Sequence, residues 1–263
     1  MKRILLRSIA VVLAAVIVYS GYRLWDIQHN YAQEKAVYSQ LLQYKPAPGT
    51  PSPGPALGSD PGSVPGSDSA AAGPAPVVNQ NIVDLQAKYP GVAGWLTVPN
   101  TNIDYPFAQS ADNDYYLRRD LDGKSLTAGT LFMDYRNHKD FSDFNTIVYG
   151  HHMKNGSMFG TLNFFNTRSF FDNNATGTIY LADKTYKIKF FAFIVIRPDD
   201  AEIYDPAVSG DADKAAFLTY VKSAARYYRD VGVTLNDRLV TLSTCNYEFN
   251  NARMVLIGTL TEN

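Results

Sequence analysis

The sequence has little cysteine and no excess of positive charge. Its 263 residues contain one cysteine, so the chain cannot form an internal disulfide. A cysteine-rich zinc site is excluded as well, because it needs several thiolates at short spacings. The 24 Lys and Arg residues are balanced by 25 Asp and Glu residues, so the composition gives no reason to expect a nucleic-acid partner. With 46% hydrophobic residues the chain can build a core, which argues against global disorder.

One segment, residues 46–76, lacks aromatic residues and also lacks Lys, Arg and Glu. It contains nine of the 14 prolines and six of the 18 glycines. Such a composition cannot bury enough apolar surface to offset the entropy lost on ordering. We therefore predict a linker that acts as a semi-flexible spacer, with a typical span of about 30 Å.

The N-terminal segment contains a long run without charged side chains, Ser8–Tyr22. If Arg7 snorkels, Ile4–Leu6 extend the run toward the ~20 residues that a membrane-spanning helix needs. A cleaved signal peptide is the alternative, but interfacial aromatic residues rather than a small-residue cleavage site follow the run. We predict an uncleaved signal anchor within residues 1–25 and a juxtamembrane stalk helix at residues 26–45. Basic residues lie mainly before the run, which predicts a cytoplasmic N-terminus and an extracellular remainder.

Residues 77–263 have the length of one ordinary domain. Eight short segments are rich in β-branched and aromatic residues, which predicts a mainly β fold, a closed eight-stranded β-barrel with a few peripheral helices. The predicted strands are 94–98, 103–107, 130–134, 146–150, 178–182, 186–196, 239–244 and 254–260. Helical periodicity predicts a long helix over Asp213–Arg229, and shorter helices are expected at 82–88, 112–117 and 158–165.

Cys245 stands at the end of the predicted strand 239–244, directly after Thr244, and is followed by Asn246-Tyr247-Glu248. A lone cysteine is more often a small buried hydrophobe than a nucleophile. Three features favour the nucleophile here. The thiol is unpaired in a chain expected to be exported, it stands at a strand end, and the sequence contains His and Arg residues that could activate it.

Two of the four histidines, His151 and His152, directly follow the predicted strand 146–150. Adjacent residues on an extended segment point to opposite sides, so only one of the pair can face a given site. His29 lies in the stalk, and His138 lies in a polar loop where it is expected to be solvated. No further ligands at matching spacing indicate a metal site.

Arg253 opens the last predicted strand, eight residues after Cys245. A turn of that length allows the last two strands to pair as an antiparallel hairpin, which would bring Arg253 beside Cys245. From spacing alone, a surface salt bridge is the commoner role for such an arginine.

Seven short segments resemble landmarks of the sortase family, most closely class B, in the expected order across nearly all of residues 77–263. They are Val92–Leu96, Asn102–Pro106, Asp112–Leu117, Asp134–Asn137, Tyr149–Met153, Thr241–Cys245 and Ala252–Val255. The resemblance implies a sortase β-barrel of eight strands with a long helix inserted before the cysteine strand. It implies no cofactor and no metal.

The resemblance also assigns the site. Cys245 would be the nucleophile, His151 rather than His152 the catalytic histidine, and Arg253 the cation near the developing oxyanion. Substrate binding is assigned to Thr244 and Ser243, which directly precede the cysteine.

Sortases are cysteine transpeptidases, so the resemblance implies cleavage of a C-terminal sorting motif after Thr, through a thioester, and transfer to a cell-wall peptidoglycan amine. The expected partners are secreted surface proteins that carry a sorting signal, the peptidoglycan amine, and the membrane through the N-terminal anchor.

Two alternatives stay open. A pilin-polymerising sortase would use a lysine amine of another pilin. Class C pilin enzymes usually carry an Asp-Pro-aromatic lid and often a C-terminal membrane segment, whereas Asp60-Pro61 is followed by Gly62 here and no apolar run follows the last strand. A non-catalytic binding domain with a sortase-like barrel is the second alternative, and the joint presence of Cys245, His151 and Arg253 argues against it.

Overall fold

The structure, a computed structural model, describes residues 2–47, 78–245 and 252–263. The chain divides into two units, Met1–Gln40 and Leu41–Asn263. Nearly all of the predicted linker, and the segment Asn246–Glu248, lie outside the described residues.

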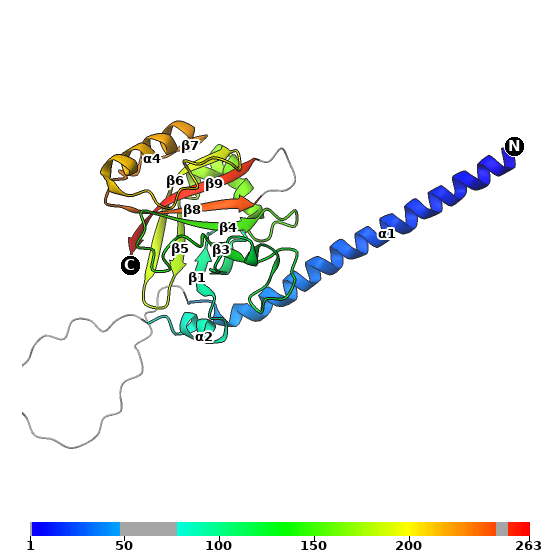
Figure 1. The fold of residues 1–263 in the computed structure, drawn as a ribbon, viewed down its shortest axis with the longest axis horizontal. Coiled ribbons are helices and arrows are strands. Elements are labelled where there is room, and N and C mark those ends of the chain that lie inside the picture. Colours follow the sequence, from blue (N-terminus) through cyan, green and yellow to red (C-terminus); the bar gives the residue numbers. More distant parts are fainter. Residues whose placement is uncertain (1, 48–77, 246–251) are drawn as a thin grey trace, which may run out of the picture. The chain divides into compact units, whose positions relative to one another are not determined.

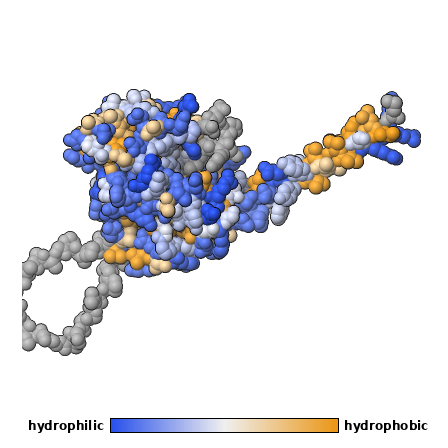
Figure 2. All heavy atoms as spheres, viewed as in Figure 1, coloured by the Kyte–Doolittle hydropathy of each residue, from blue (hydrophilic) through white to orange (hydrophobic). Residues whose placement is uncertain are grey.

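The first unit is formed by helix α1 (Lys2–Leu41), of which only the last residue, Leu41, belongs to the second unit (Figure 1). The helical stretch Lys2–Tyr44 includes a window of mean hydropathy 2.2, long and apolar enough to cross a membrane. Figure 2 shows these apolar side chains in orange along α1. The predicted anchor and nearly all of the predicted stalk lie within this one continuous helix.

The second unit is built on a closed β-barrel, which confirms the predicted fold class. Eight strands follow one another in the order β5-β1-β2-β3-β4-β8-β9-β6, and pairing of β5 with β6 closes the ring. The strands are β1 (Val92–Thr97), β2 (Asp104–Ala108), β3 (Leu131–Met133), β4 (Asn145–His151), β5 (Thr176–Tyr180), β6 (Thr185–Ile196), β8 (Arg238–Cys245) and β9 (Arg253–Glu262). Each overlaps one of the eight predicted segments.

Large aromatic side chains fill the core. Trp95, Phe107, Phe141 and Tyr186 are all fully buried. The Phe107 and Phe141 rings meet edge to face with centroids 5.9 Å apart, and Phe141 lies 6.0 Å from Tyr186. These rings come from strands and loops far apart in the sequence, so their packing ties the ring of strands together.

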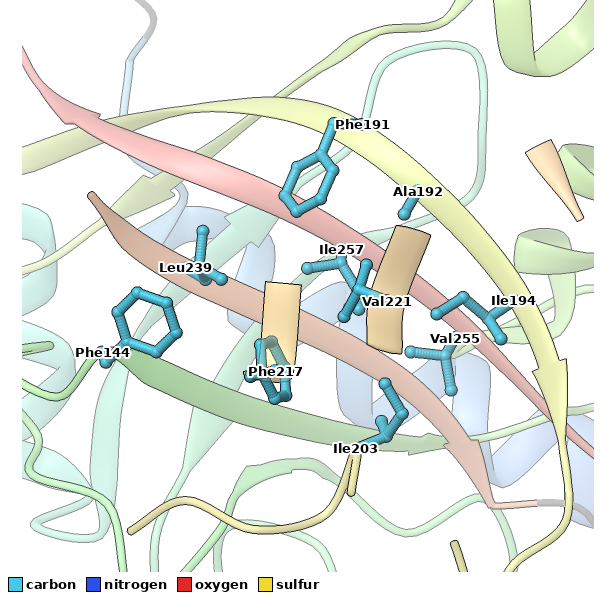
Figure 3. Packing of buried hydrophobic residues seen from close by; sticks show 10 residues of the cluster. All are labelled: Phe144, Phe191, Ala192, Ile194, Ile203, Phe217, Val221, Leu239, Val255 and Ile257. Carbon is cyan, nitrogen blue, oxygen red and sulfur yellow. The ribbon is translucent and has the colours of Figure 1, made fainter. Parts of the chain in front are cut away.

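A second apolar layer lies between helix α4 (Gly210–Ala224) and the barrel (Figure 3). Phe217 and Val221 of α4 pack with side chains of β6, β8 and β9, and Ile203 of the preceding loop joins them. Burial of this apolar surface holds α4 and its loop against the barrel.

The long helix predicted over Asp213–Arg229 ends earlier, at Ala224. Tyr227–Tyr228 forms the short strand β7, which pairs with the edge of β6. The Arg226 N–H donates to Phe193 O at 2.9 Å and the Arg229 N–H to Phe191 O at 2.7 Å. Hydrogen bonding to a sheet edge thus overrides the apparent helical periodicity of the two tyrosines.

The remaining helices are short. The predicted helix at 82–88 is α2 (Gln80–Lys88), whereas those at 112–117 and 158–165 correspond to 3-10 turns. The other short elements are η1 (Leu42–Tyr44), η2 (Tyr115–Arg118), η3 (Gly160–Asn166) and α3 (Arg168–Asn173).

Both ends of segment 48–77 are held on the second unit. On one side, Lys45 Nζ lies 2.5 Å from Asp104 Oδ2, and Asn81 Nδ2 donates to Lys45 O at 2.9 Å. On the other side, the Asn79 N–H donates to Ala182 O at 2.7 Å. The predicted spacer therefore connects two points of the second unit, and the chain passes between the units at Gln40–Leu41.

Candidate active site

The parallel pair β4 and β8 brings two predicted site residues together. The register matches Tyr149 with Ser243, Gly150 with Thr244, and His151 with Cys245. Parallel strands end at the same edge of a sheet, and register partners share one of its faces. The last residue of each strand, His151 or Cys245, therefore stands beside the other at one edge of the barrel.

Arg253 joins the same edge through the predicted antiparallel pairing of β8 and β9, which is confirmed by the match of Ser243 with Val255. Arg253 Nη1 donates to Thr244 O at 3.2 Å, directly before Cys245. The turn between the strands lies outside the described residues. Its flanks nevertheless place the guanidinium next to the backbone that carries the cysteine.

The His151 imidazole is held by a main-chain carbonyl. Its Nε2 lies 2.6 Å from Leu117 O. A carbonyl oxygen can only accept, so Nε2 carries the hydrogen of this bond. Proton exchange with a reacting group would then use Nδ1.

The Leu117 carbonyl is fixed in turn by its surroundings in η2. The Thr130 N–H donates to Tyr116 O and the Leu126 N–H to Arg118 O, both at 3.0 Å. Gly129 has φ +61°, and a Cβ there would lie 2.4 Å from Leu117 O. Only glycine allows this close approach without displacing the carbonyl that orients His151.

The other two histidines of the barrel lie elsewhere. His152 forms an isolated antiparallel bridge with Met158. His138 Nδ1 lies 2.7 Å from Asp143 Oδ1, and this hydrogen bond raises the pKa of His138. The His138 side chain is largely exposed, as the polar loop predicted.

A cavity of about 310 Å³ opens beside these strand ends. Its lining residues are Asn113, Asp114, Leu117, Phe132, Tyr149, Pro198, Tyr204, Ser243 and Arg253. Tyr149 and Ser243 lie two residues before His151 and Cys245 on their strands, so positions 151 and 245 continue the same face. The cavity mixes aromatic and apolar walls with a few polar groups, which suits a peptide ligand.

The structure places the two predicted substrate-binding residues differently. Ser243 lines the cavity, and its Oγ lies 2.9 Å from the Tyr204 hydroxyl. Thr244 is buried, and its Oγ1 accepts from the Met254 N–H at 3.0 Å. Its side chain therefore braces the hairpin.

A buried carboxylate, that of Asp134, accepts hydrogen bonds from two residues that line the cavity. The Tyr149 hydroxyl donates to Asp134 Oδ2 at 3.0 Å, and Asn113 Nδ2 donates to the same oxygen at 3.1 Å. Burial opposes ionisation of Asp134, but hydrogen bonds from Arg136 and Tyr149 outweigh it and hold the pKa below the ordinary value of 3.8. Burial, followed by the charge of Asp134, raises the pKa of Tyr149, so the phenol stays a donor.

Sequence reasoning gave no role to Asn113, Tyr149 or Tyr204. Asn113 and Tyr149 lie in recognised segments, and their polar side chains beside the predicted site were an available signal. Tyr204 lies in a loop without periodicity, so no local pattern could have identified it. Among the residues that the structure describes, no group of three or more His, Cys, Asp or Glu side chains could hold a metal ion.

Comparisons with known proteins agree with this geometry. A family model described as Sortase domain matches residues 96–261. Sortase B of Listeria monocytogenes is 32% identical over 268 residues, covering 98% of each chain. A crystal structure of sortase B from Bacillus anthracis has a TM-score of 0.66 at 34% identity, covering 71% of this chain and 86% of that one. A Staphylococcus aureus sortase B–substrate complex has a TM-score of 0.66 at 28% identity, covering 70% and 86%. The chain therefore belongs to the sortase family of transpeptidases and is class B-like.

Proposed function

We propose that this protein is a membrane-anchored cysteine transpeptidase that cleaves secreted surface proteins after the Thr of a C-terminal sorting motif and transfers them to a peptidoglycan amine. The register of β4 and β8, which matches His151 with Cys245 beside a cavity of about 310 Å³, is the observation that carries the proposal. Family membership supports the reaction class.

The first step is attack of the Cys245 thiolate on the carbonyl carbon of the scissile Thr–Gly or Thr–Asn bond. A C–S bond forms, and the tetrahedral intermediate collapses with loss of the C–N bond. His151, protonated on both nitrogens, gives the Nδ1 proton to the leaving amine, while Nε2 keeps its bond to Leu117 O. An amino group then attacks the thioester carbon and gives a proton to the neutral Nδ1 of His151. The new C–N bond forms, the C–S bond breaks, and the thiolate and the protonated imidazole are restored. Water in place of the amine gives hydrolysis.

Arg253 is proposed to stabilise the oxyanion of both tetrahedral intermediates. Its bond to Thr244 O holds the guanidinium at the strand end before any substrate arrives. Preorganised donors of this kind each typically contribute about 3 to 4 kcal/mol.

Ser243 and Thr244 are proposed to serve the substrate in different ways. Ser243 presents its hydroxyl to the cavity, together with Tyr204. Thr244 acts through the main chain, because its carbonyl holds Arg253 and its hydroxyl holds the start of β9.

The enzyme is expected to cleave fluorogenic peptides of the Asn-Pro-x-Thr-Asn or Ser/Pro-Pro-x-Thr-Gly type. In the presence of a short peptide with a free α-amine, a transpeptidation product should replace the hydrolysis product, because both arise from one thioester. Mass spectrometry of the products from a peptide library would measure both.

A peptide that offers only a lysine side-chain amine is the matched acceptor, and preference for it would favour pilin polymerisation instead. Absence of cleavage for every library member would refute the transpeptidase proposal.

The anchor is proposed from α1, whose apolar window follows the basic N-terminal residues. We expect the mature protein to fractionate with membranes and to retain its first residues, with the barrel outside the cell. N-terminal sequencing of the mature protein is the measurement, and a mature chain that begins after residue 25 would contradict the anchor.

A further inference from the structure

We propose that Arg136 is a positioning residue that fixes Tyr204 in the wall of the cavity and thereby sets the affinity for the peptide substrate. This inference rests on the proposed function for its substrate, and on the geometry of residues outside the reacting groups for its mechanism.

Arg136 lies outside the cavity lining and joins two of the cavity walls. Its Nε donates to Asp134 Oδ1 at 2.9 Å and its Nη2 to Asp134 Oδ2 at 2.8 Å. The same Nη2 donates to Tyr204 O at 3.0 Å. Because a guanidinium is planar and its donors are fixed, pairing with Asp134 sets the direction in which Arg136 holds Tyr204.

The Asp134 carboxylate that binds this guanidinium is itself held in place by burial. Its side chain is 0% exposed, against 42% for that of Arg136. Through Asn113 and Tyr149 the same carboxylate binds two further cavity residues. One buried charge therefore connects three parts of the wall, and Arg136 carries the connection to Tyr204.

The loop that carries Tyr204 is also held from the α4 side. Ile203 is buried in the cluster beneath α4 (Figure 3), and its N–H donates to Asp200 Oδ1 at 3.0 Å. Tyr220 of α4 donates its hydroxyl hydrogen to Asp200. That hydrogen bond raises the pKa of Tyr220 to about 12, so the phenol remains a donor at neutral pH. Arg136, in the loop between β3 and β4, adds a hydrogen bond from that loop to Tyr204.

The position of Tyr204 matters because its hydroxyl meets Ser243 Oγ at 2.9 Å inside the cavity. A shift of the Tyr204 main chain would break this contact and change the space left for a peptide. In the described structure Arg136 hydrogen-bonds Asp134 and Tyr204 rather than the strand-end groups. Its loss should therefore weaken binding more than it slows the chemical steps.

The experiment compares Arg136→Ala and Arg136→Lys with the unmodified protein in three measurements: steady-state cleavage of a fluorogenic sorting peptide, thermal unfolding, and hydrogen–deuterium exchange of segment 198–206. We expect KM to rise roughly tenfold in both variants, with kcat changed less than about threefold, and exchange in segment 198–206 to increase. Lysine keeps a charge beside Asp134 but lacks the fork, so Arg136→Lys should unfold near the wild-type temperature and still show the raised KM. If Arg136 had a purely structural role, Arg136→Lys would restore both the unfolding temperature and the KM of the wild type.

Removing Arg136 leaves the Asp134 charge buried without its main partner, which can prevent folding. The double variant Asp134→Asn/Arg136→Ala removes that charge and keeps an amide oxygen for Tyr149. It is expected to fold and to show the same raised KM. Arg168→Ala breaks a surface ion pair with Asp172 and should change none of the three measurements.

Unchanged exchange in segment 198–206 of Arg136→Lys, or an unchanged KM despite faster exchange, would overturn the inference. If the unmodified protein cleaves no sorting peptide, the proposed function fails, and the exchange data still decide whether Arg136 positions Tyr204.

Discussion

Cys245→Ala is expected to lower cleavage of a fluorogenic sorting peptide by roughly 10⁴-fold or more, because alanine leaves no nucleophile to form the thioester. The fold should survive. Strand β8 is held by backbone hydrogen bonding to β4 and β9. Leu242 and Ser243, which precede the cysteine on this strand, are buried without its side chain. Peptide cleavage, far-ultraviolet circular dichroism and the unfolding temperature of the variant are the measurements.

The chain provides its own control for this experiment, because Cys245 is its single cysteine. Iodoacetamide can alkylate one thiol, so the loss of activity should follow the mass increase of one adduct per chain. Cleavage at the wild-type rate in either the alanine variant or the fully alkylated protein would rule out the cysteine mechanism.

The second large effect is expected at His151, where substitution by alanine should lower kcat/KM by roughly 10²- to 10⁴-fold, the range of a general acid. His151→Gln sharpens the test. A glutamine amide can still donate to Leu117 O, but it has no nitrogen that titrates near neutral pH. The glutamine variant should therefore keep the unfolding temperature of the wild type and lose activity as the alanine variant does.

His152→Ala is the matched control, since His152 directly follows in the chain and pairs with Met158 instead. It should retain activity within a few-fold of the wild type. If His152→Ala were inactive and His151→Ala active, the assignment of the two histidines would be reversed.

The barrel could be predicted from the sequence because each of its strands has a local signature. β6, for example, is a long run rich in β-branched and aromatic residues, and β9 is a run of mainly aliphatic and β-branched residues. Both lie where the pattern predicts them. The end of α4 could not be predicted, since Tyr227 and Tyr228 suit a helical stripe and a sheet edge equally well. Pairing with β6, a tertiary effect, decides between the two.

The candidate site was partly predictable for a related reason. Strand ends are visible in the sequence, and Cys245, His151 and Arg253 each stand at one. The spacing of the last two strands predicted their hairpin and so the approach of Arg253 to Cys245. The pairing of β4 with β8 joins strands far apart in the sequence, so the meeting of His151 with Cys245 followed from the family resemblance alone. Tyr204 and Arg136 are 68 residues apart, in loops without periodicity, and their hydrogen bond has no signature in either segment.

The parallel pairing of β4 with β8 also bears on the order of events during folding. β4 is complete long before β8 emerges during synthesis, yet His151 acquires its register partner only when β8 pairs with β4. Contacts that close so long a loop form late, because the entropy of closure must be lost before the contacts repay it. Shorter nascent chains that end before β8 lack the thiol altogether. Positions 151 and 245 therefore become register partners only after most of the chain has been made, and the proposed centre is assembled only once β8 has joined the barrel.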